Sequence, residues 1–460
     1  MPRPTLLVSS VLIAVFLTAV GLLIGLTTCN RQGQSQPVVD IDLPSLSTGD
    51  PSGTLAVRVH APGCAQSRYD VGAPVLIWVP GGYESEGIDH GLPPQAKDMV
   101  IITFLFPGGD DQWAGRSSDG TYDYRGDDCI MALRDVIRYA AGELTDDQGR
   151  TIDEVVSCTV LHDNIGLIGP SNGGNVIVAA PALYGDELAG HLRYIIQWET
   201  PVSSQVATRD FGRVWLKPSA QQGDYFNPRY SGYGSLTLGA DYSDLAYDAS
   251  SPDYQVFHDG NSDGTYTTTP LPGSGLRSPD LDLDGVLTAS EDFPLDYYID
   301  DAKQYYSRPV THALADNDVF GGVWPEGIAT PAEADAFWDI REAVRLYDEA
   351  VATIPDLQAM VLAGERDHVQ SAPDKLHIHQ AMEGWLSNGV LWVQLNPDPS
   401  YLIQTEPALE GRTDLPPNAP NTTPTDWEDV ASYCVPEDID AGVYQLAAAW
   451  QMADRIQRGQ

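Results

Sequence analysis

Short apolar runs, each closed by glycine, proline or acidic residues, recur along the chain and predict buried strands. They lie at 54–60, 74–79, 99–106, 164–168, 194–198, 358–363 and 390–395. Most are apolar at nearly every position, which is typical of strands buried on both faces of a parallel sheet. Apolar residues at helical spacing follow at 127–141, 175–184, 330–347, 374–386 and 439–456. This alternation predicts an α/β fold with a mostly parallel sheet flanked by helices.

The regular pattern is interrupted once, between the strands at 194–198 and 358–363. The interruption is rich in Tyr, Asp, Ser, Gly and Pro, and a stretch of this length is typical of an insertion. The pattern therefore divides the chain into five parts. They are a leader at 1–29, a polar linker at 30–52, the first part of the core at 53–202, an insertion or lid at 203–329, and the second part of the core at 330–460, which ends in a helix.

The charge balance narrows the range of partners. The 460 residues include 65 acidic and 25 basic side chains, a formal net charge of −40. Such a surface repels nucleic acid and favours solubility and bound cations.

The first residues predict export. Leu6 to Thr28 contains no charged residue and is long enough to cross a bilayer. Cys29 follows, so the segment is either a lipoprotein signal with the lipid on Cys29 or an uncleaved membrane anchor. Both alternatives place the remaining chain on the extracellular or periplasmic face of a membrane.

Four further cysteines favour an oxidising compartment. They are Cys64, Cys129, Cys158 and Cys434. An even number outside the cell predicts two disulfides, with three possible pairings.

A serine lies in a glycine-rich turn between a predicted strand and a predicted helix. Gly169, Ser171 and Gly173 form the pattern Gly-x-Ser-x-Gly. Glycines on both sides allow a turn so sharp that the serine hydroxyl is exposed at the helix N-terminus, where developing negative charge is favoured. The pattern makes Ser171 a candidate nucleophile.

Three motifs resemble the α/β-hydrolase superfamily, most closely its dienelactone hydrolase and prolyl oligopeptidase branch. They are the serine turn at 169–173, the segment Val79-Pro80-Gly81-Gly82-Tyr83, and the loop Gly364-Glu365-Arg366-Asp367-His368-Val369. The resemblance covers 53–202 and 330–402. It implies that Ser171 is the nucleophile and Asp367 the acid that orients a histidine. It also implies that the N–H groups of Asn172 and of Gly82 or Tyr83 hold an oxyanion.

The catalytic histidine departs from the family pattern. The resemblance places it after the last strand, but the loop at 396–401 contains no histidine, and none follows His379. His368, beside Asp367, is the first candidate for the base, with His377, His379 and His90 as alternatives. Glu199, directly after the strand at 194–198, is an alternative acid.

The segment Asp280 to Glu291 matches a twelve-residue EF-hand calcium loop. Oxygen ligands fall at the expected positions, with glycine at position 6 and an apolar residue at position 8. The candidate calcium ligands are Asp280, Asp282, Asp284, the carbonyl of Val286, Thr288 and Glu291. A second segment beginning at Asp259 matches only in its first half, because Pro270 occupies position 12. That segment either binds calcium weakly with help from outside the loop or forms an Asx-rich turn, and we favour the turn.

Together these features predict an exported, membrane-anchored serine hydrolase that acts on a small-molecule ester or peptide and carries a calcium-stabilised insertion. The alternative is a catalytically inactive surface binding protein on the same fold, which the missing histidine favours. A third, weaker interpretation is a calcium-dependent adhesion module.

Overall fold

The computed structural model describes most of the chain after Pro37. It covers residues 38–460 except 64–65, 83–86, 89–97, 209, 211–226, 231–239, 252–253, 274, 276, 301–302, 370–374, 417–418 and 421–426. Residues 38–460 form one compact unit. The predicted leader, Cys64, Tyr83 and His90 lie outside the described residues. Among the described residues, no helix has the length and apolar character that a membrane span requires.

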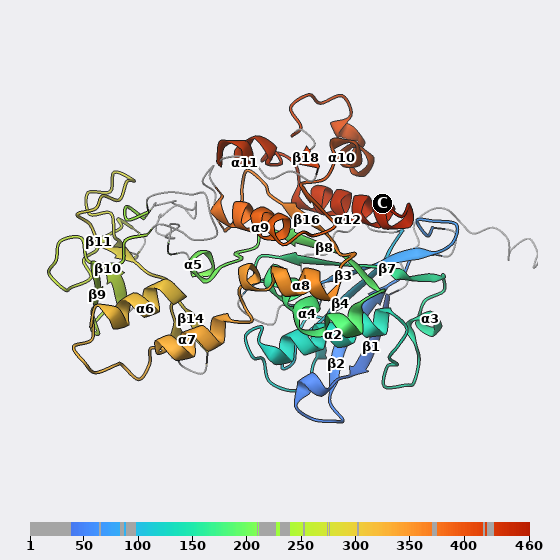
Figure 1. The fold of residues 1–460 in the computed structure, drawn as a ribbon, viewed down its shortest axis with the longest axis horizontal. Helices are drawn as coiled ribbons and strands as arrows, with labels where there is room; N and C mark the ends of the chain where they lie inside the picture. The colour runs from blue at the N-terminus through green and yellow to red at the C-terminus, as the bar shows by residue number, and fades with distance from the viewer. Residues whose placement is uncertain are drawn as a thin grey trace, which may run out of the picture. The chain divides into compact units, whose positions relative to one another are not determined.

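The described core is built on a sheet in the order β1-β2-β4-β3-β7-β8-β16-β17-β18 (Figure 1). Parallel pairing joins β4, β3, β7, β8, β16 and β17, whereas β2 and β18 each run antiparallel to their neighbours. The strands are β1 (Val38–Pro44), β2 (Thr54–His60), β3 (Ala73–Trp78), β4 (Val100–Phe104), β7 (Val160–Pro170), β8 (Leu192–Trp198), β16 (Gln358–Leu362), β17 (Trp392–Leu395) and β18 (Ala419–Pro420). The predicted α/β fold with a mostly parallel sheet is therefore confirmed.

The two faces of the sheet carry different helices because successive side chains of a strand point to opposite sides. Val75 and Ile77 pack with the helices of one face, and Leu76 and Trp78 pack with those of the other. On the first face lie α2 (Asp127–Ala140), α4 (Gly173–Leu188), α8 (Tyr347–Thr353) and α9 (Leu376–Ser387). On the second lie α10 (Pro399–Thr405) and the long α12 (Ala441–Gln457) (Figure 1).

The linker predicted at 30–52 is wrong for its second half. Residues 38–44 form β1, which pairs antiparallel with β2 along its whole length. Ile41 and Leu43 are buried in the core. Polar residues alternate with these apolar ones, so the segment has the period of an edge strand despite its polar composition.

One predicted helix also needs correction, and two helices in the second part of the core were missed. The helix predicted from 330 to 347 is divided into α7 (Pro331–Trp338), a short 3-10 turn at 343–345, and α8. The capping box that begins α7 is present, because the Thr330 hydroxyl accepts a hydrogen bond from Glu333 N–H and the Glu333 carboxylate accepts one from Thr330 N–H. The sequence pattern missed α10 and α11 (Trp427–Tyr433).

The insertion contains more regular structure than its composition predicted. Its described strands are β9 (Leu245–Tyr247), β10 (Val256–His258), β11 (Thr269–Pro270), β12 (Arg277–Ser278), β13 (Phe293–Pro294), β14 (Tyr298–Asp300) and β15 (Lys303–Tyr305); its helices are α5 (Ser204–Ala207) and α6 (Arg308–Asp316). Val256, Phe293, Tyr306 and Leu314 belong to an apolar cluster of its own. The insertion therefore has a local core that several short elements share.

The expectation of two disulfides is wrong. Cys129 and Cys434 are both buried free thiols. Burial raises the pKa of each, that of Cys434 to about 12. With two of the four cysteines held as thiols, two bridges cannot form.

Candidate functional site

The serine turn has the strained geometry that its sequence predicted. Ser171 stands between β7 and α4 with a φ of 48°, a conformation that costs energy for a residue with a side chain. Its N–H donates to the carbonyl of Trp198, which fixes the turn against the neighbouring strand β8. A Cβ on Gly173 would lie 2.5 Å from the carbonyl oxygen of Val79, so this position requires glycine.

A cavity of about 630 Å³ opens at the carboxyl ends of these strands. Ser171, Asn172, Gly81 and Gly82 line one side of it. The other lining residues come from the carboxyl ends of β3, β7, β8 and β16 and the segments after β8 and β16, from α5, and from the segment before α12 and the first turn of α12. They are Trp78, Pro170, Trp198, Glu199, Pro201, Val206, Ala207, Gly364, Glu365, Arg366, His368, Val369, Val435, Pro436, Glu437, Ile439, Asp440, Ala441 and Tyr444. A cavity of this size suits a small organic ligand or a short segment of a larger one.

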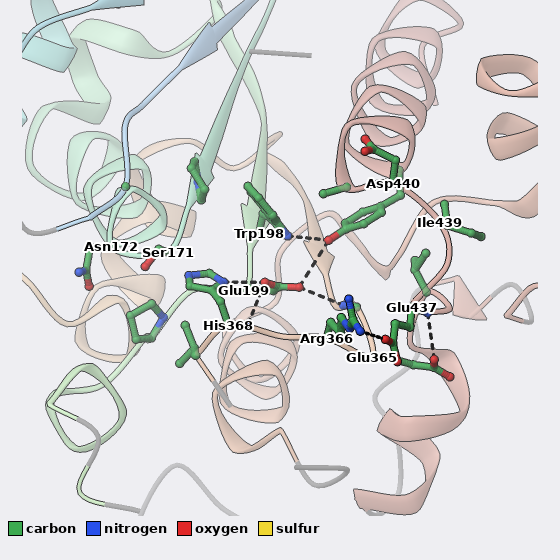
Figure 2. Close-up of a pocket in the computed structure, with 18 of the residues that line it drawn as sticks. Ser171, Asn172, Trp198, Glu199, Glu365, Arg366, His368, Glu437, Ile439 and Asp440 are labelled. Atoms are coloured by element: carbon green, nitrogen blue, oxygen red, sulfur yellow. Dashed lines mark hydrogen bonds and ion pairs between the residues drawn. The ribbon is translucent and has the colours of Figure 1, made fainter. Parts of the chain in front are cut away.

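His368 lies between the serine and a carboxylate. Figure 2 shows the imidazole with one edge toward the Ser171 hydroxyl and the other toward Glu199. The Nδ1 atom of His368 lies 2.6 Å from Oε2 of Glu199. A proton on Nδ1 is therefore donated to Glu199, which leaves Nε2 as the nitrogen that can accept a proton. Of the histidines in the described part of the chain, only His368 lines the cavity.

Glu199, like Ser171, has a positive φ, and its side chain is buried and hydrogen-bonded. It follows β8 directly, has a φ of 47° and is 3% exposed. Its carboxylate accepts hydrogen bonds from the N–H groups of Gly364 and His368, each at 3.3 Å, and from the Tyr444 hydroxyl at 3.4 Å. Burial, and then the charge of Asp367, raise the pKa of Glu199, while the hydrogen bond with His368 acts in the opposite direction.

Asp367, the acid that the family resemblance implied, is bound to a different histidine. Its Oδ2 lies 2.7 Å from Nε2 of His377 on α9, and both side chains are fully buried. Burial favours a raised pKa, but the charge and hydrogen bond of His377 hold the pKa of Asp367 below its ordinary value. One carboxylate oxygen of Asp367 still lies within 4.8 Å of the Glu199 and His368 ligand atoms. The structure thus places Glu199 in hydrogen-bond contact with the His368 ring and Asp367 in hydrogen-bond contact with His377.

The loop after the last parallel strand has a structural role in place of the missing histidine. Asn396 stands there with a φ of 60°. Its side chain accepts a hydrogen bond from Ala363 N–H and donates one to the Ala363 carbonyl, which ties the end of β17 to the end of β16. Glu199 and His368 each lie one strand earlier than the positions where the resemblance places an acid and a histidine: Glu199 follows β8, and His368 lies in the loop after β16.

The carbonyls of Pro80 and Gly81, in the segment beside the serine, are held by a residue outside the cavity lining. The buried guanidinium of Arg125 donates to the carbonyls of Gly81 and Pro80, and Asn172 Nδ2 donates to the carbonyl of Gly82 at 3.1 Å. Arg125 does not line the cavity. Because C=O and N–H point in opposite directions across a trans peptide, holding the Gly81 carbonyl outward directs the Gly82 N–H inward. Gly82 has a φ of 76°, which favours glycine at this position.

The two other histidine candidates that the structure describes, His377 and His379, do not line the cavity. His377 is hydrogen-bonded to Asp367. His379 on α9 is 6% exposed, and its Nδ1 lies 3.8 Å from Oε2 of Glu383. Sequence reasoning named Glu199 and His368 separately but not as a pair. The sequence signal for Glu199 was its place directly after a predicted strand, and that for His368 was its place beside Asp367 in the loop after the strand at 358–363. Nothing in the sequence pointed to Arg125.

The residues of the predicted calcium loop are brought together in part. One ligand atom from each of Asp280, Asp282 and Asp284 lies within 4.8 Å of the others. Glu291 lies across the loop and accepts hydrogen bonds from the N–H groups of Leu281 and Thr288. Val286 follows Gly285, whose φ of 93° produces the sharp turn that position 6 requires.

Comparisons with known proteins give similarity to solved structures alone. No family model and no curated protein matches the chain. The α/β hydrolase GrgF from Penicillium sp. sh18 is 21% identical, with 37% of this chain and 48% of that one covered and a TM-score of 0.26. The hyperthermophilic esterase of the archaeon Pyrobaculum calidifontis is 16% identical, with 44% and 55% covered and a TM-score of 0.27. EstE1, a thermostable carboxylesterase cloned from a metagenomic library, is 17% identical, with 40% and 54% covered and a TM-score of 0.26.

The matched regions span about half the length of these solved structures. At such low identity and TM-score, the description of the fold rests on the strand order and pairing of this chain.

Proposed function

We propose that this protein is a serine hydrolase that cleaves a small ester or peptide by acyl transfer through Ser171. The observation that carries the proposal is the position of the His368 imidazole between the Ser171 hydroxyl and the buried Glu199 carboxylate (Figure 2). A serine hydroxyl needs an adjacent base to become a nucleophile at neutral pH, and the base needs a third group to orient it.

In the proposed reaction His368 first accepts a proton and then returns it. Nε2 of His368 accepts the Ser171 proton as Oγ attacks the carbonyl carbon, and Glu199 stabilises the imidazolium through Nδ1–H. The N–H groups of Gly82 and Asn172 stabilise the negative charge on the carbonyl oxygen. His368 then protonates the leaving alcohol or amine, and water releases the acyl group from Ser171 by the same steps in reverse order.

The inactive binding protein was favoured only by the absence of a histidine after the last strand. His368, in the loop after β16, can supply the imidazole, so the missing histidine after β17 no longer favours the inactive binding protein.

Labelling by a fluorophosphonate probe tests the proposal. The full chain should label in the native state, and Ser171→Ala should abolish labelling. His368→Gln should slow it by about 10²-fold or more, whereas His379→Gln, a change of the same chemistry on α9, should leave the rate nearly unchanged. A folded wild-type protein that does not label would contradict the proposal and return the binding protein as the better interpretation.

We also propose that residues 1–29 anchor the protein on the extracellular or periplasmic face, with calcium stabilising the insertion. Palmitate incorporation that disappears in Cys29→Ser would identify a lipoprotein. Membrane association without incorporation would identify an uncleaved anchor. Recovery of the full chain in the soluble fraction of cells would contradict both.

A further inference from the structure

Two loops of the insertion share one hydrogen-bond pattern. In the first, Gly285 N–H donates to Oδ2 of Asp280 at 2.7 Å, and Val286 N–H donates to Oδ1 of Asp284 at 2.8 Å. Asp280, Asp282 and Asp284, at positions 1, 3 and 5, each have a ligand atom within 4.8 Å of the others. Like charges at such distances repel unless a cation lies between them.

A buried and unpaired oxygen at this point independently indicates a ligand. Asp280 is fully buried, and its Oδ1 has no hydrogen-bond partner. Its Oδ2 is occupied by Gly285 N–H. Leaving a buried carboxylate oxygen unsatisfied costs on the order of 1–3 kcal/mol or more. A cation coordinated by Oδ1 would remove that cost, and no donor among the described residues does so.

The oxygen-only ligand set favours calcium. Asp280, Asp282 and Asp284 supply carboxylates, and the Val286 carbonyl and Thr288 follow at the positions that complete such a loop. Calcium accepts six to eight oxygens in flexible geometry, whereas magnesium demands a near-ideal octahedron and gives up its water reluctantly.

The second loop repeats the pattern at Asp259. Gly264 N–H donates to Oδ2 of Asp259 and Thr265 N–H to Oδ1 of Asp263, each at 2.8 Å. The residues at position 4 of the two loops, Ser262 and Leu283, both have a φ of 60°. The Asx-rich turn predicted from sequence is therefore present, and it has the backbone of the first loop.

Asp292 takes the place of the acid that the second loop lacks. Glu291 binds the N–H groups of positions 2 and 9 in its own loop, those of Leu281 and Thr288. Asp292 binds the same two positions of the second loop, with Gly260 N–H at 3.0 Å and Thr267 N–H at 2.8 Å. Asp292 is 1% exposed. Asp292, from outside the loop, thus accepts the hydrogen bonds that Pro270 at position 12 has no carboxylate to accept.

The two loops are joined through this pair of adjacent acids. A Cβ on Gly260 would lie 2.4 Å from the carbonyl oxygen of Glu291, so the second loop touches the backbone that closes the first. Arg229 donates to the carbonyls of Ala289 and Glu291 on the same segment. A change in the position of Glu291 must therefore move Asp292 and the Asp259 loop.

We propose that the Asp280 loop binds a calcium ion, and that Glu291 and Asp292 transmit this binding to the Asp259 loop, so that the ion orders both.

Isothermal titration with calcium tests the site. Asp280→Asn and Asp284→Asn should each bind one ion fewer per chain than the wild type, or bind it at least tenfold more weakly. Asp284 is exposed, so its variant should fold even if the buried Asp280→Asn does not. Asp316→Asn, an equal change of charge on the exposed side of α6, should bind as the wild type does. Binding unchanged in the folded Asp284→Asn protein would overturn the site.

Hydrogen exchange tests the coupling. Calcium should slow exchange of the Gly260 and Thr267 amides, both of which donate to Asp292, by at least tenfold in the wild-type chain. It should not slow them in Asp284→Asn. Equal slowing in both proteins, or none in a wild-type chain that binds calcium, would overturn the coupling.

Discussion

At the scale of single residues, the distinction that matters is between two neighbouring acids. Glu199 contacts the His368 ring, whereas Asp367, which precedes His368 in the chain, contacts His377. Adjacent side chains diverge, so proximity in sequence was a poor guide to which acid orients the histidine. The strained φ of Ser171 and of Glu199 marks both as positions that the fold holds against a local energetic cost.

Replacing each acid by its amide should separate their roles. Glu199→Gln removes the negative charge that stabilises imidazolium, and we expect kcat for a p-nitrophenyl ester to fall by about 10³–10⁴-fold with little change in KM. Asp367→Asn should lower kcat by less than tenfold but lower the melting temperature, because it breaks a fully buried pair with His377. The opposite ranking of kcat values would show that Asp367 is the orienting acid.

Arg125 should act on catalysis without touching substrate. Its guanidinium holds the carbonyls of Pro80 and Gly81, and lysine cannot reproduce that planar geometry. We expect Arg125→Lys to reduce kcat by about 10–10²-fold while KM changes little, because the Gly82 N–H would lose its direction. Arg134→Lys, at a partly buried arginine stacked on Tyr184, is the matched control. A pure KM effect at Arg125 would refute the assignment.

At the scale of elements, the serine turn is a junction where β7 and α4 closely approach the segments that follow β3 and β8. Glycine at 173 and at 174 permits this approach, since a Cβ at 174 would lie 1.8 Å from the Thr200 hydroxyl oxygen. The turn and the segment at 80–82 are therefore one packed unit, and the position of the serine depends on both.

Gly173→Ala should disrupt that unit. The added Cβ would meet the carbonyl oxygens of Val79 and Pro80 at 2.5 and 2.7 Å, both of which are backbone atoms that cannot rotate away. We expect at least a 10²-fold loss of kcat/KM and a lower melting temperature. Gly327→Ala, at a position with no atom within 4 Å of the added Cβ, should change neither. An active, stable Gly173→Ala enzyme would contradict this account of the junction.

At the scale of the whole molecule, a buried acid connects two distant parts of the insertion. Asp210, fully buried, accepts hydrogen bonds from the hydroxyls of Thr208, Tyr242 and Ser307. Burial raises the pKa of Asp210 to about 7, although these hydroxyls act in the opposite direction. The folded chain therefore binds this proton more tightly than the unfolded chain does.

The sign of the pH effect follows from that difference. The contribution of Asp210 to stability is fully present below the unfolded pKa of 3.8 and is lost as the pH rises toward about 7. Asp210→Asn cannot titrate, so the free energy of unfolding of the wild type relative to the variant should fall with pH across this window, by up to about 1.4 kcal/mol per pH unit. Urea unfolding of both proteins between pH 4.5 and 8 measures it. A difference that stays constant with pH would refute the prediction.

The sequence by itself determined the features that depend on local pattern. Strand and helix periodicity gave the α/β class, the glycines around Ser171 gave the turn, and the Thr330–Glu333 capping box marked the start of α7, because each is set by residues a few positions apart. The tertiary structure decided which side chains meet. Glu199 and His368 are 169 residues apart in the chain, and Asp292 serves a loop that begins at Asp259. Such contacts depend on which strand ends lie side by side, a property of the whole sheet and insertion that no local spacing encodes.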